Sequence, residues 1–265
     1  LEEAEGSLDK AAEILRKKGI IKAAKRADKI ASEGQVVAKV DGNIAVVLEI
    51  NSETDFVAKN DDFKNLVQKL ADHALANKPK SAEEMLGQSI DGEKVEDFLK
   101  NTTAKIGEKI TLRRLELLEK GDGDAFGDYI HMAGKIGVLV QLASTDNDEV
   151  ARDIAMHAAA ANPGYLQREE VPAEVVAKEK EVYEVQLKKE NKPENIMENI
   201  IKGKLNKFYG EVCLVEQAYI KDDSQKISQI LPEGAKIVKF VRFELGDGIK
   251  KKETDFVSEV QEQMG

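Results

Sequence analysis

Four consecutive residues combine a hydroxyl, a carboxylate and two apolar side chains: Thr54, Asp55, Phe56 and Val57 (the TDFV turn). The surrounding sequence ETDFV, at residues 53–57, recurs at residues 253–257. Both copies are typical of a helix start, since Thr or Asp accepts hydrogen bonds from the free N–H groups of a first turn. At 253–257 we favour capping alone. At 53–57 a capped turn would also present Asp55 to a partner's ion contacts and Phe56 to a partner's pocket, with little entropy left to lose on docking.

Histidine is the side chain best suited to acid–base chemistry near neutral pH, but the positions of the three histidines argue against catalysis. His73 and His157 occupy the same place in two similar helical segments, which favours packing or capping. His131 lies in a strand pattern and is interpreted as structural or interfacial. No nucleophile elbow, phosphate-binding loop, HExxH motif or Cys–His pair occurs. The glycine–aspartate segments 121–124 and 246–248 lack the spacing of a calcium loop and predict turns.

Length and charge narrow the class of protein further. The 265 residues are enough for one large or two small domains without disulfide or metal support. Fifty acidic against 40 basic residues give a net charge of −10, which argues against direct binding of nucleic acid. The single cysteine, Cys213, excludes a disulfide framework, and no apolar run reaches the roughly 18 residues that a membrane span needs. We therefore expect a cytoplasmic protein with no cofactor, no membrane contact and no signal peptide, and we interpret the start at Leu1 as a fragment or a processed form.

An internal repeat is the most informative feature of the sequence. Residues 42–50 (GNIAVVLEI) match residues 134–142 (GKIGVLVQL), and residues 70–79 (LADHALANKP) match residues 154–163 (IAMHAAAANP). The first copy carries eight more residues between strand and helix, and these include the TDFV turn. A segment that one copy has and the other lacks is not needed to close the fold, and loops on a rigid scaffold are where binding residues collect.

Hydrophobic periodicity and turn residues predict the elements around this turn. A helix begins after it, because Phe63, Leu66, Val67, Leu70 and Ala74 share one face, and Pro79 ends that helix. Residues 77–94 are expected to form a linker with one short helix. Strands are predicted at 36–40 and 44–50 around an Asp-Gly turn, at 104–119, on either side of Ala133–Gly134, and at 237–248 together with a closing turn.

The segment 172–210 has a different character, with two charged helical stretches separated by Asn191–Lys192–Pro193. We interpret it as an antiparallel helical hairpin with a narrow apolar seam. The seam is expected to consist of one stripe on each helix: Val175, Val182 and Val185 on the first, and Ile196, Ile200, Leu205 and Phe208 on the second. Short helices are also predicted at 7–19 and from residue 254 onward.

Five segments together resemble elongation factor Ts, in order and at family spacing. They are EINSETDFVAKNDDF from residue 49, GKIGVLVQL, IAMHAAAANP, KFYGEVCL from residue 207 and VRFELGDGIKKKETDF from residue 241. The resemblance implies an α+β fold of two similar subdomains, each with a three-stranded antiparallel sheet packed by helices. It also implies an inserted helical hairpin (a coiled coil) and a short C-terminal helix. The implied domains are a remnant of an N-terminal three-helix domain at 1–19, a linker at 20–34, subdomains at 35–125 and 126–252 with the hairpin at 172–210, and a C-terminal module at 253–265.

The same resemblance implies a function. Such a factor is not an enzyme but a guanine-nucleotide exchange factor, whose partner is elongation factor Tu in its GDP-bound and nucleotide-free forms. By resemblance, Thr54, Asp55, Phe56 and Val57 would enter the GTPase and disturb its magnesium site. His131 and the C-terminal module would form further contacts, and the hairpin would be able to form a homodimer. Two alternatives stay open from the residues: a non-catalytic binding or holding module for a GTPase or translation complex, and a hydrolase using Asp55 or His131, for which no second catalytic group lies at readable spacing.

Overall fold

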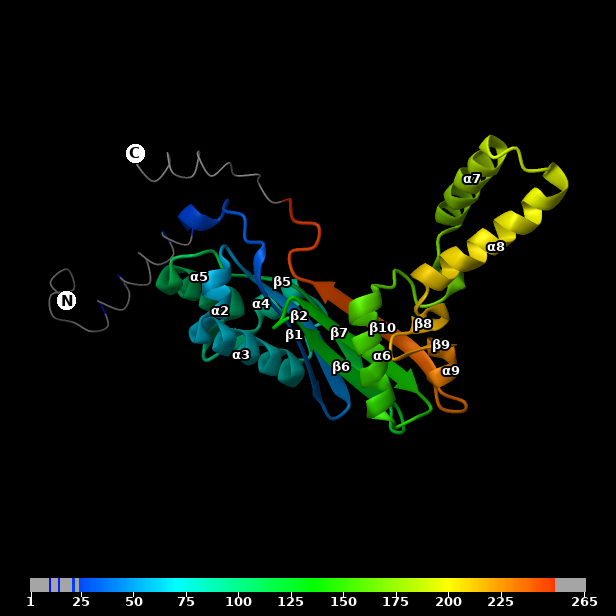
Figure 1. The fold of residues 1–265 in the computed structure, drawn as a ribbon. Coiled ribbons are helices and arrows are strands. Elements are labelled where there is room, and N and C mark those ends of the chain that lie inside the picture. Colours follow the sequence, from blue (N-terminus) through cyan, green and yellow to red (C-terminus); the bar gives the residue numbers. More distant parts are fainter. Residues whose placement is uncertain (1–9, 11–13, 15–20, 22–23, 251–265) are drawn as a thin grey trace. The chain divides into compact units, whose positions relative to one another are not determined.

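The computed structural model describes residues 10, 14, 21 and 24–250 (Figure 1). The helices predicted at 7–19 (apart from two single positions) and from residue 254 onward, together with the C-terminal module, lie outside the described residues. Two three-stranded antiparallel sheets and the helices around them give the α+β class expected from the sequence. The described residues divide into two compact units: one holds those up to 37, 48–115 and 243–250, and the other holds 38–47 and 116–242. The subdomain boundaries proposed from the sequence stay a prediction.

The first sheet has the order β1-β2-β5. Its strands are β1 (Glu33–Asp41), β2 (Ile44–Ser52) and β5 (Thr111–Glu119). The predicted Asp-Gly hairpin is confirmed, because only Gly42 and Asn43 separate β1 from β2 and Gly42 takes the left-handed φ of 56° that such a turn requires. The central strand β2 is almost entirely buried, and its buried residues include the charged Glu49.

Helix α3 (Asp61–Asn77) buries the face that the sequence predicts. Phe63, Leu66, Val67, Leu70 and Ala74 are all buried. The helix ends at the left-handed residue Lys78, immediately before Pro79, which has no N–H to continue it.

The expected linker at 77–94 is wrong in part, because it contains more structure than one short helix. The short helix is α4 (Ala82–Gly87), and it is followed by a small hairpin of β3 (Ser89–Ile90) and β4 (Glu93–Lys94). Helix α5 (Val95–Ile106) then follows directly. The strand expected from residue 104 therefore begins only at Thr111, because Gly107, at φ 88°, ends α5 by donating its N–H to the Thr103 carbonyl at 2.8 Å.

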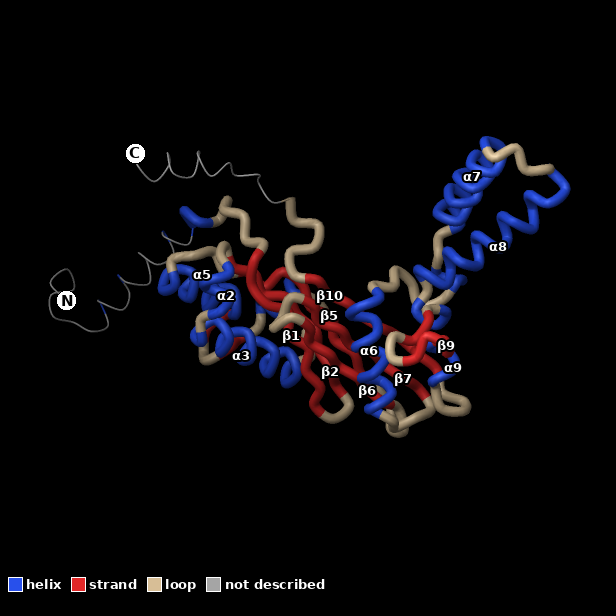
Figure 2. Tube along the Cα trace, viewed as in Figure 1, coloured by secondary structure: helices blue, strands red, loops and turns tan. Residues whose placement is uncertain are grey.

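The second sheet has the order β10-β7-β6 (Figure 2). Its strands are β6 (Ala125–His131), β7 (Ile136–Ala143) and β10 (Lys236–Glu244). Helix α6 (Asp148–Ala161) packs on β6 and β7 through Ala151, Ile154, Ala155 and Ala158. Gly127 allows this close approach, since a Cβ at that position would lie 2.0 Å from the Ala151 carbonyl carbon.

The duplicated histidines are buried and make the same contact in both copies, as their predicted packing or capping role requires. His73 Nε2 lies 3.0 Å from Gln88 Oε1, and His157 Nε2 lies 3.0 Å from Gln217 Oε1. Gln88 Nε2 donates to Asn77 O, at the end of α3, and Gln217 Nε2 donates to Ala161 O, at the end of α6, both at 3.4 Å. Each pair therefore satisfies a carbonyl at a helix C-terminus. Each glutamine is followed by a small hairpin and a helix, which in the second copy are β8 (Ala218–Tyr219), β9 (Asp222–Lys226) and α9 (Ile227–Ile230).

The predicted helical hairpin consists of α7 (Ala173–Lys189) and α8 (Glu194–Val212), which pack on each other. Two 3-10 turns precede and follow it, at Arg168–Glu170 and Leu214–Glu216. The two helices lie in the stretch that separates His157 from Gln217, so the hairpin is an insertion in the second copy.

The stripes predicted for this hairpin are partly wrong. Val182, Val185 and Ile196 are exposed. The buried seam is Leu187, Met197 and Ile201, with Tyr183, Ile200 and Leu205 packed against it. The seam follows the i, i+4 rows of long side chains, Tyr183 to Leu187 and Met197 to Ile201 to Leu205, because these rows lie one above another on a helix face.

The turn predicted at 246–248 is confirmed and is anchored to a buried carboxylate. Glu49 Oε1 accepts from the Gly246 N–H at 2.9 Å and from Arg113 Nη1 at 3.0 Å, and Oε2 accepts from Arg114 Nε at 2.7 Å. Burial alone would raise the pKa of Glu49. The bonds from Gly246, Asn51 and the two arginines outweigh it and hold this pKa below its ordinary value.

No helix in the part of the chain that the structure describes is long and apolar enough to cross a membrane.

Candidate functional site

The TDFV turn forms the start of a one-turn helix, α2 (Asp55–Lys59), between β2 and α3. Thr54 is its N-cap, with an extended backbone (φ −123°, ψ 156°), and its hydroxyl accepts from the Val57 N–H at 3.4 Å. Asn60 ends α2 and also caps α3, since its side chain accepts from the Asp62 N–H at 2.8 Å. The segment present only in the first copy of the repeat is therefore this short capped helix, and the capping prediction for 53–57 is confirmed.

The short helix buries one face and presents the other. Ala58 is buried, and its carbonyl accepts from Gln35 Nε2 at 3.0 Å. Phe56 is 81% exposed, the largest exposure among the exposed large apolar side chains of the described residues. Asp55 Oδ2 pairs with Lys59 Nζ at 2.6 Å on the solvent side. The short helix is thus held in place by its buried face, while the Phe56 ring and the Asp55 carboxylate lie on its solvent side.

A glutamate that the sequence analysis missed holds this base. Thr54 donates twice to Glu108: its backbone N–H to Oε2 at 2.9 Å and its hydroxyl to Oε1 at 2.6 Å (the Glu108 clamp). A carboxylate acceptor makes such bonds stronger than neutral ones. The Thr54 hydroxyl therefore donates to Glu108 while it accepts from Val57, which uses one donor and one of two acceptor positions.

Glu53, the residue before the turn, is bound by the same neighbouring loop. Its Oε1 accepts from the Lys109 N–H at 2.7 Å, and its Oε2 accepts from Arg26 Nη1 at 2.9 Å. Lys109 Nζ in turn donates to the carbonyls of Ala27 and Lys29, at 2.5 and 3.1 Å. Residues 53 and 54 are thus both fixed by the loop between α5 and β5, and no short motif could reveal this pairing because the partners lie more than 50 positions apart in the sequence.

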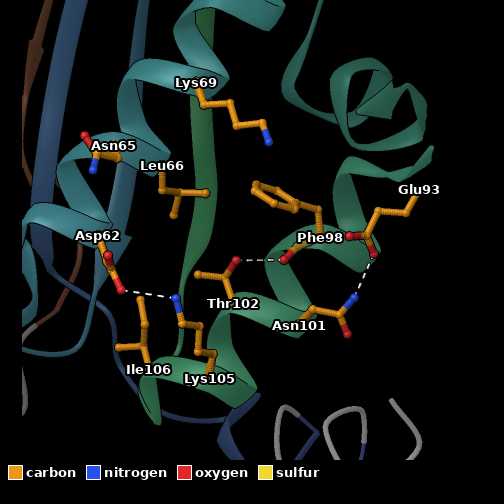
Figure 3. Close-up of a pocket in the computed structure, with 10 residues that line it drawn as sticks. All are labelled: Asp62, Asn65, Leu66, Lys69, Glu93, Phe98, Asn101, Thr102, Lys105 and Ile106. Atoms are coloured by element: carbon orange, nitrogen blue, oxygen red, sulfur yellow. Dashed lines mark hydrogen bonds and ion pairs between the residues drawn. The ribbon is translucent and has the colours of Figure 1, made fainter. Parts of the chain in front are cut away.

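A surface groove of about 360 Å³ lies between α3 and α5 (Figure 3). Four of its polar side chains form two pairs: Lys105 Nζ lies 3.1 Å from Asp62 Oδ2, and Asn101 Nδ2 donates to Glu93 Oε2 at 2.7 Å. Lys69 pairs with Asp91 and lies 4.9 Å from the centre of the Phe98 ring. The hydroxyl that lines the groove, Thr102, donates to the Phe98 carbonyl at 2.9 Å and not to a base.

His131 belongs to the second compact unit, whereas the TDFV turn belongs to the first, and the structure describes each unit by itself. His131 is the last residue of β6, paired with Ile136 of β7. Its ring stacks on Tyr129, with centroids 6.0 Å apart and planes 26° apart, and Tyr129 Oη lies 3.4 Å from His131 Nδ1. The residue is half-buried at the mouth of a turn, which agrees with a structural or interfacial role.

The other titratable groups singled out from the sequence are buried. Burial lowers the pKa of His157, and its bond to Gln217 opposes this only in part. The Nδ1 atom of His157 accepts from the Ile220 N–H at 3.2 Å, so protonation there would break a hydrogen bond. Burial raises the pKa of the Cys213 thiol to about 11, which makes it unreactive near neutral pH. Within residues 24–250 and the three single positions described before them, no three His, Cys, Asp or Glu side chains gather as metal ligands would.

A comparison with protein families decides the assignment. The sequence model of the family described as Elongation factor TS matches residues 53–247. The chain belongs to the elongation factor Ts family. Elongation factor Ts has its function in translation, and the matched segment begins at Glu53, so it contains the whole TDFV turn, Glu108, His131 and the helical hairpin.

Proposed function

We propose that this family member is the guanine-nucleotide exchange factor of elongation factor Tu. It would bind the GDP-bound form, promote release of GDP and remain on the nucleotide-free form, without acting as an enzyme on a small molecule and without a cofactor. The observation that supports this best is the 81% exposed Phe56 ring on a turn whose base is fixed by Glu53 and Glu108. Exposed single apolar residues are common, but one on a fixed extra segment is suited to insertion.

Phe56 and Asp55 have separate tasks in this proposal. A Phe side chain that passes from water into an apolar pocket contributes about 1.5–3 kcal/mol. Because Glu53 and Glu108 already hold the turn in place, little of this free energy is offset by the entropy lost when the turn is ordered on binding. Asp55 must leave Lys59 to act on a partner, and an exposed ion pair of this kind costs only about 0–1 kcal/mol to break.

The partner's magnesium ion is the natural target of the carboxylate. Magnesium is the largest local charge that holds a nucleotide's phosphates. Displacement of its ligands therefore lowers the affinity of the GTPase for the phosphates of GDP. Phe56 would wedge the site open, while Thr54 and Val57 keep the turn in its helical start. Each tenfold loss of GDP affinity corresponds to about 1.4 kcal/mol.

Further contacts and properties belong to the same proposal. His131 would contact the same GTPase from the second unit, and the C-terminal module at 253–265 would add a third contact. The hairpin would be able to support a homodimer, and the protein would work in the cytoplasm, away from membranes and without direct contact with nucleic acid. The two subdomains would be 35–125 and 126–252, with the hairpin insertion in the second.

Release of labelled GDP from elongation factor Tu tests the proposal. We expect the wild type to accelerate release and to bind the nucleotide-free GTPase at least about 100-fold more tightly than the GDP form, a coupling of roughly 3 kcal/mol. Linkage requires this difference, because a factor that lowers the affinity of the GTPase for GDP must itself bind the GDP form more weakly, by the same ratio. Phe56→Ala should remove most of the coupling with little change in melting temperature.

Ile220→Ala is the matched control, since Ile220 is also exposed, at 54%, but lies in the turn between β8 and β9. It should leave exchange unchanged. Equal affinity of the wild type for both forms of the GTPase would indicate a passive holding module instead. A large fall in stability of Phe56→Ala with normal exchange would show that the ring supports the fold.

A further inference from the structure

A second surface groove, of about 320 Å³, lies in the first compact unit and is largely apolar. Its lining comes from the residues before β1, from α4, from α5 and from the start of β5. The apolar members of this lining are Ala24, Ala27, Leu86, Leu99, Ile110 and Leu112. Leu99, Ile110 and Leu112 are buried, whereas Ala24 and Ala27 are exposed, so the groove opens onto the core of this unit. An apolar hollow of this kind is suited to receiving apolar side chains.

The described part of the chain ends beside this groove. Ile249 lines an adjoining groove, and Lys109 and Thr111 belong to the linings of both. In the sequence, residues 251–265 follow the last described residue. Phe256 comes seven positions after Ile249, and seven extended residues span up to about 25 Å. The segment 253–265 can therefore reach the apolar groove.

The sequence of this segment suits an apolar groove. In the helix predicted from residue 254 onward, Phe256, Val260 and Met264 recur at i, i+4 and i+8, so they share one face. A helix of about three turns is only marginally stable in water unless its apolar face packs on another surface. The groove offers such a surface close to the point where the segment leaves the described residues.

Charge favours this segment over the other end of the chain. Residues 253–265 carry four acidic and no basic side chains, whereas residues 1–20 carry five acidic and four basic ones. The two adjoining grooves are lined by four basic side chains and one acidic one. Among the basic ones, Lys109 donates to the carbonyls of Ala27 and Lys29, which leave its charge in place. Opposite charges attract the acidic segment to this surface and do little for a nearly neutral one.

We infer that residues 253–265 dock into this groove of their own chain, with their apolar face on its apolar lining. The inference goes beyond the proposed function and does not depend on it, because it concerns the protein without its partner. Under the proposed function the same residues contact the GTPase, so they would first have to leave the groove. The groove would then compete with the GTPase for this segment.

Tryptophan fluorescence of the full chain tests the docking. The wild type contains no Trp, so Phe256→Trp introduces a single reporter into the segment. Phe56→Trp is the matched control, because it lies in the same five-residue sequence, ETDFV, and replaces a ring that is 81% exposed. We expect Phe256→Trp to emit at a shorter wavelength than Phe56→Trp and to be quenched less by acrylamide.

Second substitutions in the Phe256→Trp protein locate the docked segment. Ala24→Glu and Ala27→Glu each place a carboxylate in the groove at an exposed position, and Val260→Glu places one on the apolar face of the segment. Each should shift the docking equilibrium at least about 10-fold toward release and bring emission and quenching to the values of Phe56→Trp. Ala160→Glu, at an exposed position of α6, and Ser258→Glu, on the opposite face of the predicted helix, are the matched controls and should change neither value. Melting temperatures identify any variant that does not fold, and the two groove variants serve as substitutes for each other.

Four outcomes would overturn the inference. Emission and quenching of Phe256→Trp equal to those of Phe56→Trp would show that the segment is not docked. Shielding that persists in the folded groove variants would show that it packs on another surface. Shielding that is lost on dilution would assign the groove to the segment of a second copy. Shielding of Leu15→Trp that Ala27→Glu removes, with Phe256→Trp exposed, would assign the groove to the N-terminal segment. The GTPase is absent from all these measurements, so their result is independent of whether the proposed function holds.

Discussion

Replacement of Glu108 by alanine should release the TDFV turn from the loop between α5 and β5 without changing any of the four residues that we propose to meet the partner. The variant removes both acceptors of the Glu108 clamp and leaves the Thr54 N–H and hydroxyl without their carboxylate. The cap between Thr54 and Val57 stays, but at 3.4 Å it is a weak bond. We therefore expect the turn to populate several conformations in place of one.

The structure bounds the size of the effect. Hydrogen bonds to a charged group contribute about 1.5–3 kcal/mol each, so two of them would give at least about 3 kcal/mol if fully buried. Both are only part-buried, and water can replace the lost acceptor, which reduces the sum to about 2 kcal/mol. That corresponds to a shift of about 30-fold toward released conformations. Because apparent affinity falls with the population of the competent state, we expect exchange efficiency to drop about 10-fold and by no more than about 30-fold.

The assay is the concentration of factor that gives half-maximal GDP release, measured alongside thermal melting. A double-mutant cycle with Thr54→Val isolates the bond to the hydroxyl, and the two changes should couple by about 1 kcal/mol because they remove the same contact. Glu96→Ala is the matched control: it removes one carboxylate from α5, where Glu96 pairs with Lys100 at 2.6 Å, without reaching the turn.

Two results would refute this reasoning. Exchange by Glu108→Ala within twofold of the wild type would show that the turn holds its conformation without the clamp. Strictly additive effects of Glu108→Ala and Thr54→Val would show that the two residues act separately, whatever the distance between them.

Two predictions concern the buried groups of the second unit. The folded-state pKa of His157 lies below its unfolded value of about 6.5, so the unfolded state binds more protons as the pH falls below that value. The contribution of neutral His157 to stability is therefore fully present above about pH 6.5, and it is lost as the pH falls through the folded pKa, by at most about 1.4 kcal/mol per pH unit. In urea unfolding at pH 7.5 and 5.5, the free energy of unfolding of His157→Gln should depend less on pH than that of the wild type. An equal pH dependence in the two proteins would contradict this. Cys213, with its pKa raised to about 11, should react with iodoacetamide at pH 8 about 100-fold more slowly in the folded protein than in urea; rapid labelling of the native protein would show that the thiol is accessible.

The local features of the fold were predictable from the sequence, because they rest on short-range patterns. The Asp-Gly hairpin, the buried face of α3 and the cap at Thr54 each depend on residues within about a dozen positions of one another. The repeat also identified the extra segment around the TDFV turn, since comparison of the two copies requires no knowledge of the fold. The His–Gln pairs could not be found in this way, because Gln88 follows His73 by 15 positions whereas Gln217 follows His157 by 60, beyond the inserted hairpin.

The features that could not be predicted depend on contacts between residues far apart in the sequence, or on which of two apolar rows of a helix is buried. Nothing in the sequence near Glu108 indicates that it binds Thr54. Helix α7 carries two apolar rows, and the prediction of the valine row is wrong because the longer Tyr183 and Leu187 form the seam. The sequence does not reveal helix α5, because its buried face is narrow (Val95, Leu99 and Thr103) and most of its other residues are charged or polar.

The repeat supplies an internal reference for separating fold from function. Both copies keep the His–Gln pair and the central strand, and in each copy the histidine and most of the central strand are buried. Each copy departs from the other where it adds residues: the first adds α2, which exposes Phe56, and the second adds a longer turn between β6 and β7, which exposes Met132. The hairpin is a third addition, and by the same logic we propose that it serves binding. Its seam is filled by Leu187, Met197 and Ile201 from its own two helices, so a homodimer contact would have to use the apolar residues that this seam leaves exposed, Val182, Val185 and Ile196.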